Sequence, residues 1–393
     1  MKILITGGAG FIGSNLALAL INKGHNIVVL DNLSQQIHGS NAVETSPLYN
    51  SIKNKVTFIK GDVTIKEDWQ KALTGVDVIV HYAAETGTGQ SMYEIDRYTK
   101  VNIGGTALML DLLANDKTLQ VKKVVVASSR SIYGEGKYFS EELGYVYPKH
   151  RDDSAMRKGD FEVKYANQQS ALQLVATDEE SKIHPSSVYG ITKQNQEQMV
   201  LCVCKAIGIK AIAFRYQNVY GPGQSLTNPY TGILSIFSSL ILNNKPINIF
   251  EDGKESRDFV FIDDVVAATV LGIENDTIEN DIFNVGAGVA TDVITVAKTL
   301  VVKYNKDVPL TITGNYRLGD IRHNYADLTK IKNALGFTPK VSFEEGITKF
   351  AKWVTTQTIV ESKFDVSINE MKEKACLSNA KKSINSWPQF LWL

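Results

Sequence analysis

Tyrosine and lysine residues four positions apart are the first candidates for chemistry in this sequence. On a helix such a pair lies on one face, so the ammonium group can stabilise the phenolate form of the tyrosine. A phenol with a pKa of about 10 must lose about 3 pKa units, roughly 4 kcal/mol, to act as a base at neutral pH. With 16 tyrosines chance alone produces such spacings, and four are present: Tyr49–Lys53, Tyr133–Lys137, Tyr145–Lys149 and Tyr189–Lys193.

The sequence around Tyr189 and Lys193 sets this pair apart. Two of the other pairs span a glycine or a proline, which weaken a helix, and the third precedes a strand at the opposite end of the predicted sheet. Tyr189 instead follows Pro185-Ser186-Ser187, a capping sequence, and begins a long helical pattern. Ser128 and Ser129 end a predicted strand, where a serine more often caps a turn. Together, Ser129, Tyr189 and Lys193 predict a Ser–Tyr–Lys catalytic set.

A glycine-rich segment between the first predicted strand and the first helix indicates a dinucleotide site. It reads Gly7-Gly8-Ala9-Gly10-Phe11-Ile12-Gly13, so the backbone can approach a pyrophosphate at the helix N-terminus. Asp31 ends the next strand, where a carboxylate can bind the hydroxyls of the adenosine ribose. Asn32-Leu33-Ser34 follows without an Arg or Lys for a 2′-phosphate, which favours NAD over NADP. We expect cofactor contacts from Gly7, Gly10, Phe11, Ile12, Gly13, Asp31 and Asn32.

Other strand ends supply further expected cofactor contacts. Asp62 and Val63 can meet the adenine edge, although a surface turn explains them equally well. The small residues Ala83 and Ala84 let a cofactor pass close to the backbone. Asn102, in the next predicted helix, is included although a buried structural asparagine is the commoner role. The expected cofactor set is completed by Asp62, Val63, Ala83, Ala84, Asn102, Ser128, Tyr189, Lys193 and Tyr216.

These residues need a scaffold of parallel strands covered by helices. Short β-branched runs alternate with helical patterns up to residue 216, which is typical of an α/β fold with a Rossmann-type, doubly wound parallel sheet. The expected strands are residues 2–6, 26–31, 55–60, 76–81, 121–128 and 209–216. The expected helices are residues 12–23, 65–73, 93–115 and 188–206. We predict an NAD-binding domain over 1–216, with an insertion at about 137–183 near the ligand-binding edge of the sheet.

Beyond residue 216 the pattern changes to short α+β pieces. We predict a smaller C-terminal lobe over 217–356 that binds the substrate. Its expected helices are 230–243, 264–273, 292–304 and 343–356, and its expected strands are 247–250, 259–262, 282–285 and 310–313. The tail, 357–393, has clustered lysines and ends in Trp387-Pro388-Gln389-Phe390-Leu391-Trp392-Leu393. We expect the tail to dock on the body of its own chain.

Six sequence blocks, taken in order, resemble the extended short-chain dehydrogenase/reductases, and among these the nucleotide-sugar epimerases. The blocks are GGAGFIG at 7–13, SSRSIYGEG at 128–136, SSVYGITK at 186–193, FRYQNVYGPG at 214–223, SRDFVFIDDV at 256–265 and YRLGDIRH at 316–323. The resemblance spans residues 1–356. It implies that Ser129 and Tyr189 contact the 4-hydroxyl of the sugar. It also implies that Lys193 holds the nicotinamide ribose and that Tyr216 lies by the nicotinamide.

The same resemblance implies a site for a nucleotide-diphosphate sugar. Asn218 and Arg257 would bind the diphosphate, with Arg317 beside it and Asp320 on the nucleotide ribose. The guanidinium fork suits this role because it accepts two phosphate oxygens at once. Without the resemblance, each arginine could equally form a surface ion pair. The expected substrate set is Thr86, Ser129, Arg130, Asn218, Arg257, Arg317 and Asp320.

The activity that the resemblance implies is an NAD-dependent isomerase, a 4-epimerase that oxidises the sugar transiently at C4. NAD would stay tightly bound and be regenerated in each turnover. A 4,6-dehydratase would need an Asp-Glu pair where Arg130-Ser131 stands, and a 4-ketoreductase usually consumes NADPH, which Asp31 disfavours. An NAD-binding regulatory protein need not keep the Ser–Tyr–Lys set. The sequence does not determine the identity of the hexose or of the nucleoside diphosphate, which can be dTDP, UDP, GDP or CDP.

Composition excludes several other classes. Lys+Arg and Asp+Glu both number 42, so no basic excess favours a nucleic-acid or membrane-surface partner. Three cysteines provide neither a disulfide framework nor a zinc spacing, and no metal site is expected. No signal-peptide pattern precedes the first strand, and the apolar stretch 233–242 is too short to span a bilayer. We expect a cytoplasmic protein, and the resemblance implies a homodimer through helices 93–115 and 188–206.

Overall fold

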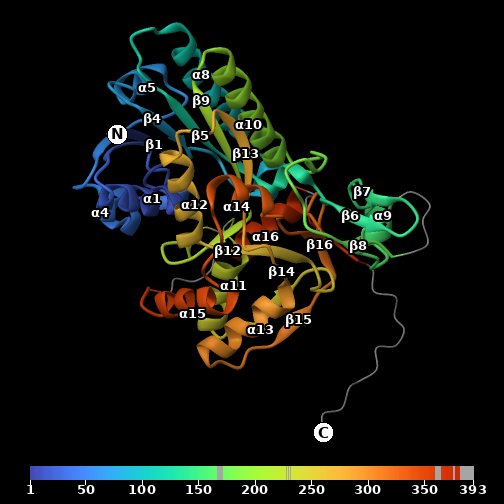
Figure 1. Cartoon of the computed structure of the whole chain (residues 1–393). Helices are drawn as coiled ribbons and strands as arrows, with labels where there is room; N and C mark the ends of the chain where they lie inside the picture. The colour runs from blue at the N-terminus through green and yellow to red at the C-terminus, as the bar shows by residue number, and fades with distance from the viewer. Residues whose placement is uncertain are drawn as a thin grey trace.

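The central sheet of the computed structural model holds seven parallel strands in the order β13-β9-β5-β4-β1-β2-β3 (Figure 1). They are β1 (Lys2–Thr6), β2 (Asn26–Asp31), β3 (Thr57–Lys60), β4 (Val78–His81), β5 (Lys123–Ser129), β9 (Lys210–Tyr216) and β13 (Asn280–Val285). The structure describes residues 1–165, 171–226, 228, 230, 232–358, 364–374 and 377–380. Apolar runs such as Ile3-Leu4-Ile5 form these strands because both faces of the sheet are buried. The predicted doubly wound α/β class is confirmed.

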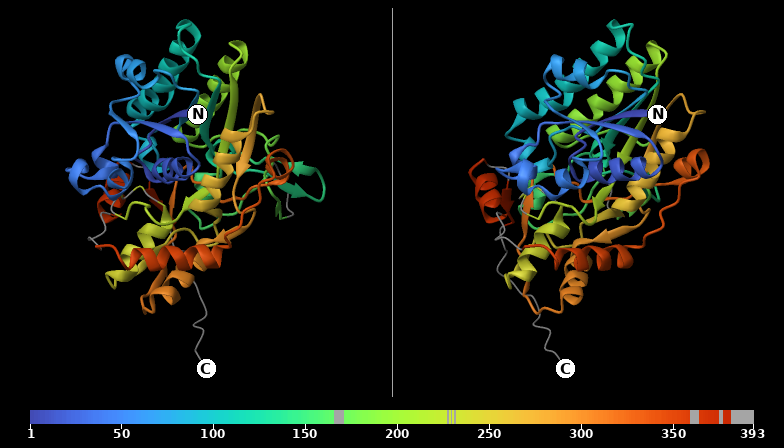
Figure 2. Two further views of the ribbon diagram at one scale, coloured as in Figure 1. Left: turned by 60° about the vertical axis from the view of Figure 1, so that its left-hand side comes forward. Right: turned by 90° about the vertical axis from the view of Figure 1, so that its left-hand side faces the viewer.

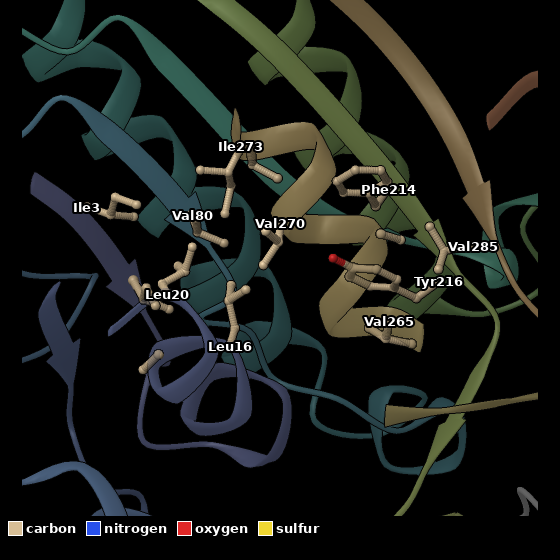
Figure 3. Packing of buried hydrophobic residues seen from close by; sticks show 14 of the residues in the cluster. Ile3, Leu16, Leu20, Val80, Phe214, Tyr216, Val265, Val270, Ile273 and Val285 are labelled. Carbon is tan, nitrogen blue, oxygen red and sulfur yellow. The ribbon is translucent and has the colours of Figure 1, made fainter. Parts of the chain in front are cut away.

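Helices cover both faces of this sheet (Figure 2). One face carries α1 (Phe11–Asn22) and α12 (Ile262–Glu274), and the other carries α5 (Lys66–Ala72), α8 (Gly105–Asn115) and α10 (Val188–Ala206). In the first layer, Leu16 and Leu20 of α1 pack with Val270 of α12 and Val80 of β4 (Figure 3). A fully buried aliphatic side chain contributes roughly 1.5–3 kcal/mol. This packing holds the strand ends, and the residues that follow them, in fixed positions.

The predictions that placed helix 264–273 and strand 282–285 in the smaller lobe are wrong. The helix is α12, which covers one face of the central sheet. The observed strand, β13, pairs in parallel with β9 along its whole length, with Phe283 opposite Phe214, and forms one edge of the central sheet. The apolar sequence of this strand fits the central sheet and the smaller lobe equally well, so the sequence pattern could not assign the strand to one of them. The chain thus leaves the sheet after β9, builds part of the smaller lobe and returns.

Other predicted elements are found with ends shifted by at most three residues, except the helix over 93–115. That segment consists of α7 (Ile95–Tyr98), a π-helical stretch (Thr99–Gly104) and α8. A π-helical stretch adds residues to the turn and re-aims the side chains that follow. The remaining short elements of this half are α2 (Gln35–His38), α3 (Ala42–Thr45), α4 (Pro47–Ile52), α6 (Thr88–Ser91) and a 3₁₀ turn (Arg130–Tyr133).

The smaller lobe lies beyond the carboxyl ends of the strands (Figure 1). Its strands are β10 (Asn218–Tyr220), β11 (Ile247–Ile249), β12 (Ser256–Phe261), β14 (Ala290–Asp292), β15 (Leu310–Ile312), β16 (Asn315–Arg317) and β17 (His323–Asn324). Its helices include α11 (Ile233–Leu242), α13 (Val293–Tyr304) and α15 (Phe343–Val354), whereas α14 (Thr329–Leu335) packs against β13 and α12 of the central sheet. Aromatic side chains, among them Tyr220, Phe261 and Phe350, fill its core. None of the described helices is long and apolar enough to cross a membrane.

The insertion forms a small antiparallel sheet of β6 (Tyr138–Ser140), β7 (Gly144–Val146) and β8 (Gln173–Leu174), with α9 (Asp153–Met156) beside it. Two buried arginines fasten it to the smaller lobe. Arg151 lies 3.1 Å from Glu135 and makes a forked pair with Glu251 at 2.8 and 2.9 Å. Arg322 reaches the same Glu251 at 2.9 Å, and Arg151 also donates to the carbonyl of Asp320 at 2.8 Å. The insertion therefore helps to hold the segment that carries Asp320.

The described part of the tail packs on the body of the chain. It contains α16 (Phe364–Glu373) and β18 (Leu377–Asn379), and β18 pairs antiparallel with β16. The aromatic end predicted to dock, 387–393, lies outside the described residues. The proposed division at residues 216 and 356 remains a prediction.

Candidate active site

A cavity of about 630 Å³ lies at the carboxyl ends of the parallel strands, between the central sheet and the smaller lobe. Nearly all of the predicted site residues meet there. Those lining it are Gly7, Gly10, Phe11, Ile12, Gly13, Asp31, Asn32, Asp62, Val63, Ala83, Ala84, Thr86, Ser128, Ser129, Arg130, Tyr189, Lys193, Tyr216, Asn218, Arg257, Arg317 and Asp320. This edge is where ligands bind in open α/β sheets.

Asn102 is the predicted site residue that does not line the cavity. Its side chain is fully buried and makes three hydrogen bonds. The amide nitrogen donates to the Glu85 carbonyl at 3.1 Å and to the Thr192 hydroxyl at 2.9 Å, while the amide oxygen accepts from the Glu85 N–H at 2.7 Å. The prediction of cofactor contact is corrected to a bracing role, because these bonds tie the loop after β4 to the helix that carries Tyr189.

The glycine loop forms a cradle that side chains would fill. A Cβ atom on Gly13 would lie 2.4 Å from the Gly7 carbonyl oxygen, and one on Gly7 would lie 2.8 Å from the Ala83 nitrogen. Gly7 also has a φ of +65°, a conformation that other residues rarely adopt. Gly10 caps α1 without a side-chain acceptor, so the first amides of the helix stay open to a ligand along this wall. Such a cradle fits a pyrophosphate.

Asp31 lies at the end of the cavity expected to hold the adenosine ribose. Its carboxylate accepts from the Ala9 N–H at 2.9 Å and from the Leu33 N–H at 2.8 Å. Burial raises the pKa of Asp31, and these amides together with His38 oppose that rise. His38 lies 3.9 Å from the carboxylate and lines the cavity, a position that its sequence context did not indicate. The donors and the carboxylate fit NAD at this end.

Tyr189 lines the cavity from the start of α10. The helix begins with a cap in which Ser187 accepts a hydrogen bond from the Gly190 N–H at 3.1 Å. Burial raises the pKa of the Tyr189 phenol. A hydrogen-bonding interaction with Ser129, and then the charge of Arg130, lower that pKa. The charge of Arg130, which directly follows Ser129 in sequence, therefore acts on the phenol in this structure, and the electrostatic role predicted for Lys193 stays a prediction.

Lys193 lies one helical turn further along α10 and lines the same cavity. Its Nζ is buried and donates to Gln196 Oε1 at 2.7 Å. Burial lowers the pKa of Lys193 to about 7, partly opposed by the negative charge of Glu197. The amine can therefore take or release a proton near neutral pH, and a negatively charged or polarisable ligand group beside it would favour the charged form.

Tyr216 presents its ring rather than its hydroxyl to the cavity. The hydroxyl lies 2.7 Å from Thr269 Oγ1 and 2.8 Å from the hydroxyl of Tyr82. The ring packs beside Phe214, Val265 and Val285 of the core (Figure 3). A flat apolar ring at this position fits a stacked or edge-on aromatic group of a ligand.

The other end of the cavity is rich in arginine. Arg257 donates through Nη1 to the Ser256 and Arg322 carbonyls, each at 2.9 Å. Arg317 lies over the Phe250 ring at 5.1 Å and 3.8 Å from Asp320. Each of these arginines has polar hydrogens beyond those contacts. Two guanidinium groups on one wall suit a diphosphate.

Several buried polar atoms on this wall have no hydrogen-bond partner among the described residues. They are Arg130 Nη1, Arg317 Nε, Asn218 Oδ1 and both amide atoms of Gln217. Burial and the nearby charge of Arg257 lower the pKa of Arg130 to about 9. Leaving such groups unpaired costs about 1–3 kcal/mol each, and more for charged groups. Phosphate oxygens of a ligand would satisfy the guanidinium and amide N–H donors, and ligand hydroxyl groups would satisfy the two amide oxygens.

Sequence reasoning missed other residues of the wall, including His38, Gln217, Tyr230, Phe250, Glu255 and Met371. Burial and Glu251 raise the pKa of Glu255 to about 7. Glu255 lies two positions before Arg257, so the strand carrying Arg257 could have drawn attention to it. Tyr230 lies in a loop and Met371 in the tail, where no pattern pointed to a site. Among the described residues, no group of three or more His, Cys, Asp or Glu is placed to hold a metal ion.

Comparison with protein families gives one matching profile. It is described as "NAD dependent epimerase/dehydratase family" and matches residues 3–159 and 162–286. A dTDP-L-rhamnose 4-epimerase from Burkholderia thailandensis is 36% identical over 358 residues, which cover 91% of this chain and 95% of that protein.

Two solved structures are similar in fold and name their ligands. The UDP-glucose 4-epimerase of Thermotoga maritima with UDP-glucose has a TM-score of 0.71 and 29% identity, covering 91% of this chain and 99% of that one. The UDP-glucuronic acid 4-epimerase of Bacillus cereus, in complex with UDP-glucuronic acid and NAD, has a TM-score of 0.73 and 26% identity with the same coverage.

Proposed function

Because the chain belongs to the NAD dependent epimerase/dehydratase family, we propose that it is a 4-epimerase interconverting dTDP-L-rhamnose and dTDP-6-deoxy-L-talose. The chain is an NAD-dependent isomerase of the nucleotide-sugar epimerase type. The supporting observation is the meeting of Ser129, Tyr189 and Lys193 with the glycine loop and the arginine-rich wall in one cavity.

In the proposed reaction the Tyr189 phenolate accepts the proton of the sugar 4-hydroxyl, and the Ser129 hydroxyl holds the same oxygen. When bound, NAD supplies a reversible hydride acceptor for C4. The 4-keto sugar then turns within the cavity, so that C4 regains a hydride on its opposite face while Tyr189 returns the proton to the same 4-oxygen. Arg130 keeps the phenolate stable during the cycle.

Residues at the two ends of the cavity keep the ligands in register. The glycine loop, Asp31 and Asn32 would hold the adenosine end and pyrophosphate of NAD, and Lys193 the nicotinamide ribose. Asn218 and Arg257 would hold the substrate diphosphate, which leaves the sugar free to turn. Arg317 would lie beside the diphosphate and Asp320 on the nucleotide ribose.

The choice of dTDP-L-rhamnose rests on sequence. Residues 83–98, the motif ASSRSIYGEG and the long insertion resemble dTDP-L-rhamnose 4-epimerase, and the Burkholderia thailandensis enzyme of that name is 36% identical. Relatives of the same fold bind UDP-glucose or UDP-glucuronic acid. A UDP-, GDP- or CDP-linked hexose is therefore the second candidate.

A proton NMR time course tests the proposal. The purified protein is mixed with dTDP-L-rhamnose, without added cofactor. New anomeric signals of the talose epimer are the expected result, and they also require that NAD has co-purified. Unchanged spectra that persist after NAD is added contradict dTDP-L-rhamnose as substrate, and UDP-, GDP- and CDP-hexoses are then compared.

We also propose a homodimer through α8 and α10. A shallow apolar groove runs along these helices and is lined in part by half-buried Leu108, Met199 and Val203. Apolar side chains on the outer faces of two adjacent helices fit the same two helices of a second copy around a twofold axis.

A further inference from the structure

The described tail meets the cavity at two places, through the side chain of Met371 and through the pairing of β18 with the strand that carries Arg317. No sequence pattern connected the tail with the site. Residues 364–374 and 377–380, here called the strap, comprise α16 and β18. Met371 of the strap lines the cavity, and its side chain is only 3% exposed. A segment that merely ended the chain would not need a buried side chain at this place.

Strand β18 fixes one end of the strap to the arginine-rich wall. Leu377 lies opposite Arg317 in the antiparallel pairing with β16, and the Ala380 N–H donates to the Gly314 carbonyl at 3.1 Å. Ala380 also packs with Tyr316 and with Met156 of the insertion. The strap is thus attached directly to the strand that supplies Arg317 to the cavity.

Helix α16 fixes the other part of the strap to the wall opposite. The Tyr230 hydroxyl donates a short hydrogen bond to the Glu370 carboxylate and lies 2.8 Å from the hydroxyl of Tyr93. Burial and the Glu370 carboxylate raise the pKa of Tyr230, so the phenol stays protonated and remains the donor. Tyr230 itself lines the cavity.

Met371 faces the loop beside the catalytic helix. A Cβ atom on Gly89 would lie 3.1 Å from Met371 Sδ, so the two residues are in direct contact. The loop is held from behind, because Tyr98 donates to the Thr86 carbonyl at 2.6 Å and to the Gly87 carbonyl at 3.0 Å. Asn102 ties the start of the same loop to Thr192, three residues after Tyr189. Met371 therefore lies against the same loop that supplies Thr86, a residue predicted to contact the substrate, to the wall of the cavity.

We propose that the strap completes the sugar pocket, with Met371 as the residue that contacts the sugar and Glu370 as the residue that positions the strap. This inference rests on the proposed function, because the ligand is taken to be a nucleotide-linked hexose. An apolar, unbranched thioether adapts to a ring that turns during the reaction. The nucleoside diphosphate, held at the arginine-rich end, does not need the Met371 contact.

The test compares Met371→Ala and Glu370→Ala with Glu373→Ala, an exposed carboxylate on the same helix. Binding of dTDP and of dTDP-L-rhamnose is measured by calorimetry, and kcat and KM by the NMR assay. For both strap variants we expect the dissociation constant and KM for the sugar nucleotide to rise about tenfold. The affinity for dTDP should stay within about twofold, and Glu373→Ala should match the wild type.

Wild-type affinity for the sugar nucleotide in both strap variants overturns the proposal, as does an equal loss of affinity for dTDP. Failure of the proposed substrate is recognised separately, because the wild-type protein then binds dTDP but not dTDP-L-rhamnose. In that case the same variants are compared with the UDP-, GDP- or CDP-hexose that the wild type binds. Circular dichroism and the thermal unfolding midpoint of each variant establish that the overall fold is retained.

Discussion

Burial of the Tyr189 phenol opposes its use as a base, so its neighbours must lower its pKa. Ser129 does so through a hydrogen-bonding interaction, and Arg130 does so through its charge. Lys193 lies on the same helical face, as its spacing predicts, but its amine donates to Gln196. The proposed Tyr189–Lys193 pair is therefore supplemented by the guanidinium of Arg130, which directly follows Ser129 in sequence.

Tyr189→Phe removes the proton acceptor and leaves the ring in place. We expect kcat to fall by about 10²–10⁴-fold, the usual contribution of a general base, with NAD still bound. The NMR assay measures turnover, and absorbance after denaturation measures released NAD. Tyr145→Phe, at a residue 63% exposed on the insertion, is the control and should be fully active. Near-normal turnover of Tyr189→Phe would remove this residue from the mechanism.

Arg130→Gln should change the pH profile of kcat in one direction. The base must be deprotonated, so activity falls as the pH drops below the pKa of Tyr189. Removing the nearby positive charge raises that pKa, and the acidic limb should move to higher pH. The effect is read from kcat between pH 5.5 and about 9.5 at saturating substrate. Arg257→Gln should raise KM without moving the limb, and an unmoved limb in Arg130→Gln contradicts its role.

Much of this site could be predicted at the level of residues. The glycine loop, Asp31 and Tyr189 follow local rules, since each stands next to a strand end or a helix start. Met371 could not be predicted, because its place depends on the pairing of β18 with β16, whose paired residues are 60 to 64 positions apart in the chain. Asn102 was predicted wrongly because an asparagine in the helix after β4 can serve either as a cofactor ligand or as a buried structural residue. The sequence does not distinguish these two roles.

At the scale of elements, the hydrophobic pattern predicts where a strand lies in the sequence, but long-range pairing decides which sheet the strand joins. Strands β1 to β9 of the central sheet were predicted to within a few residues, because each apolar run is followed by a glycine, a polar cluster or a helical pattern. The run in β13 has the same composition but joins the sheet after an excursion through the smaller lobe. The insertion, likewise, has no apolar period and is held by buried ion pairs that only the folded chain brings together.

Arg151 should matter more to stability than any exposed arginine of the insertion. Arg151→Met leaves Glu135 and one side of Glu251 without their buried cation, which costs about 3–5 kcal/mol. Arg157→Met breaks an exposed pair with Asp153 and should leave the unfolding midpoint almost unchanged. Urea unfolding followed by tryptophan fluorescence measures both. Equal midpoints for the two variants would show that the Arg151 network does not hold the insertion.

At the scale of the molecule, the groove along α8 and α10 predicts the assembly state. Light scattering after size-exclusion chromatography should give twice the chain mass for the wild type. Leu108→Glu places a charge in the proposed interface and should shift the protein toward the monomer. Val302→Glu is the matched control, because Val302 is 74% exposed on α13 and distant from both helices in sequence. A wild-type monomer would contradict the proposed dimer.

The late return of β13 has a consequence for how the chain is made. When the ribosome has released β9, six strands can pair, but the outer edge of β9 must wait until residues 280–285 emerge. Until then an apolar strand with unpaired backbone groups is open to other nascent chains. Truncated products that stop between these two strands should therefore aggregate and depend on chaperones, although they contain all of the proposed NAD-binding residues.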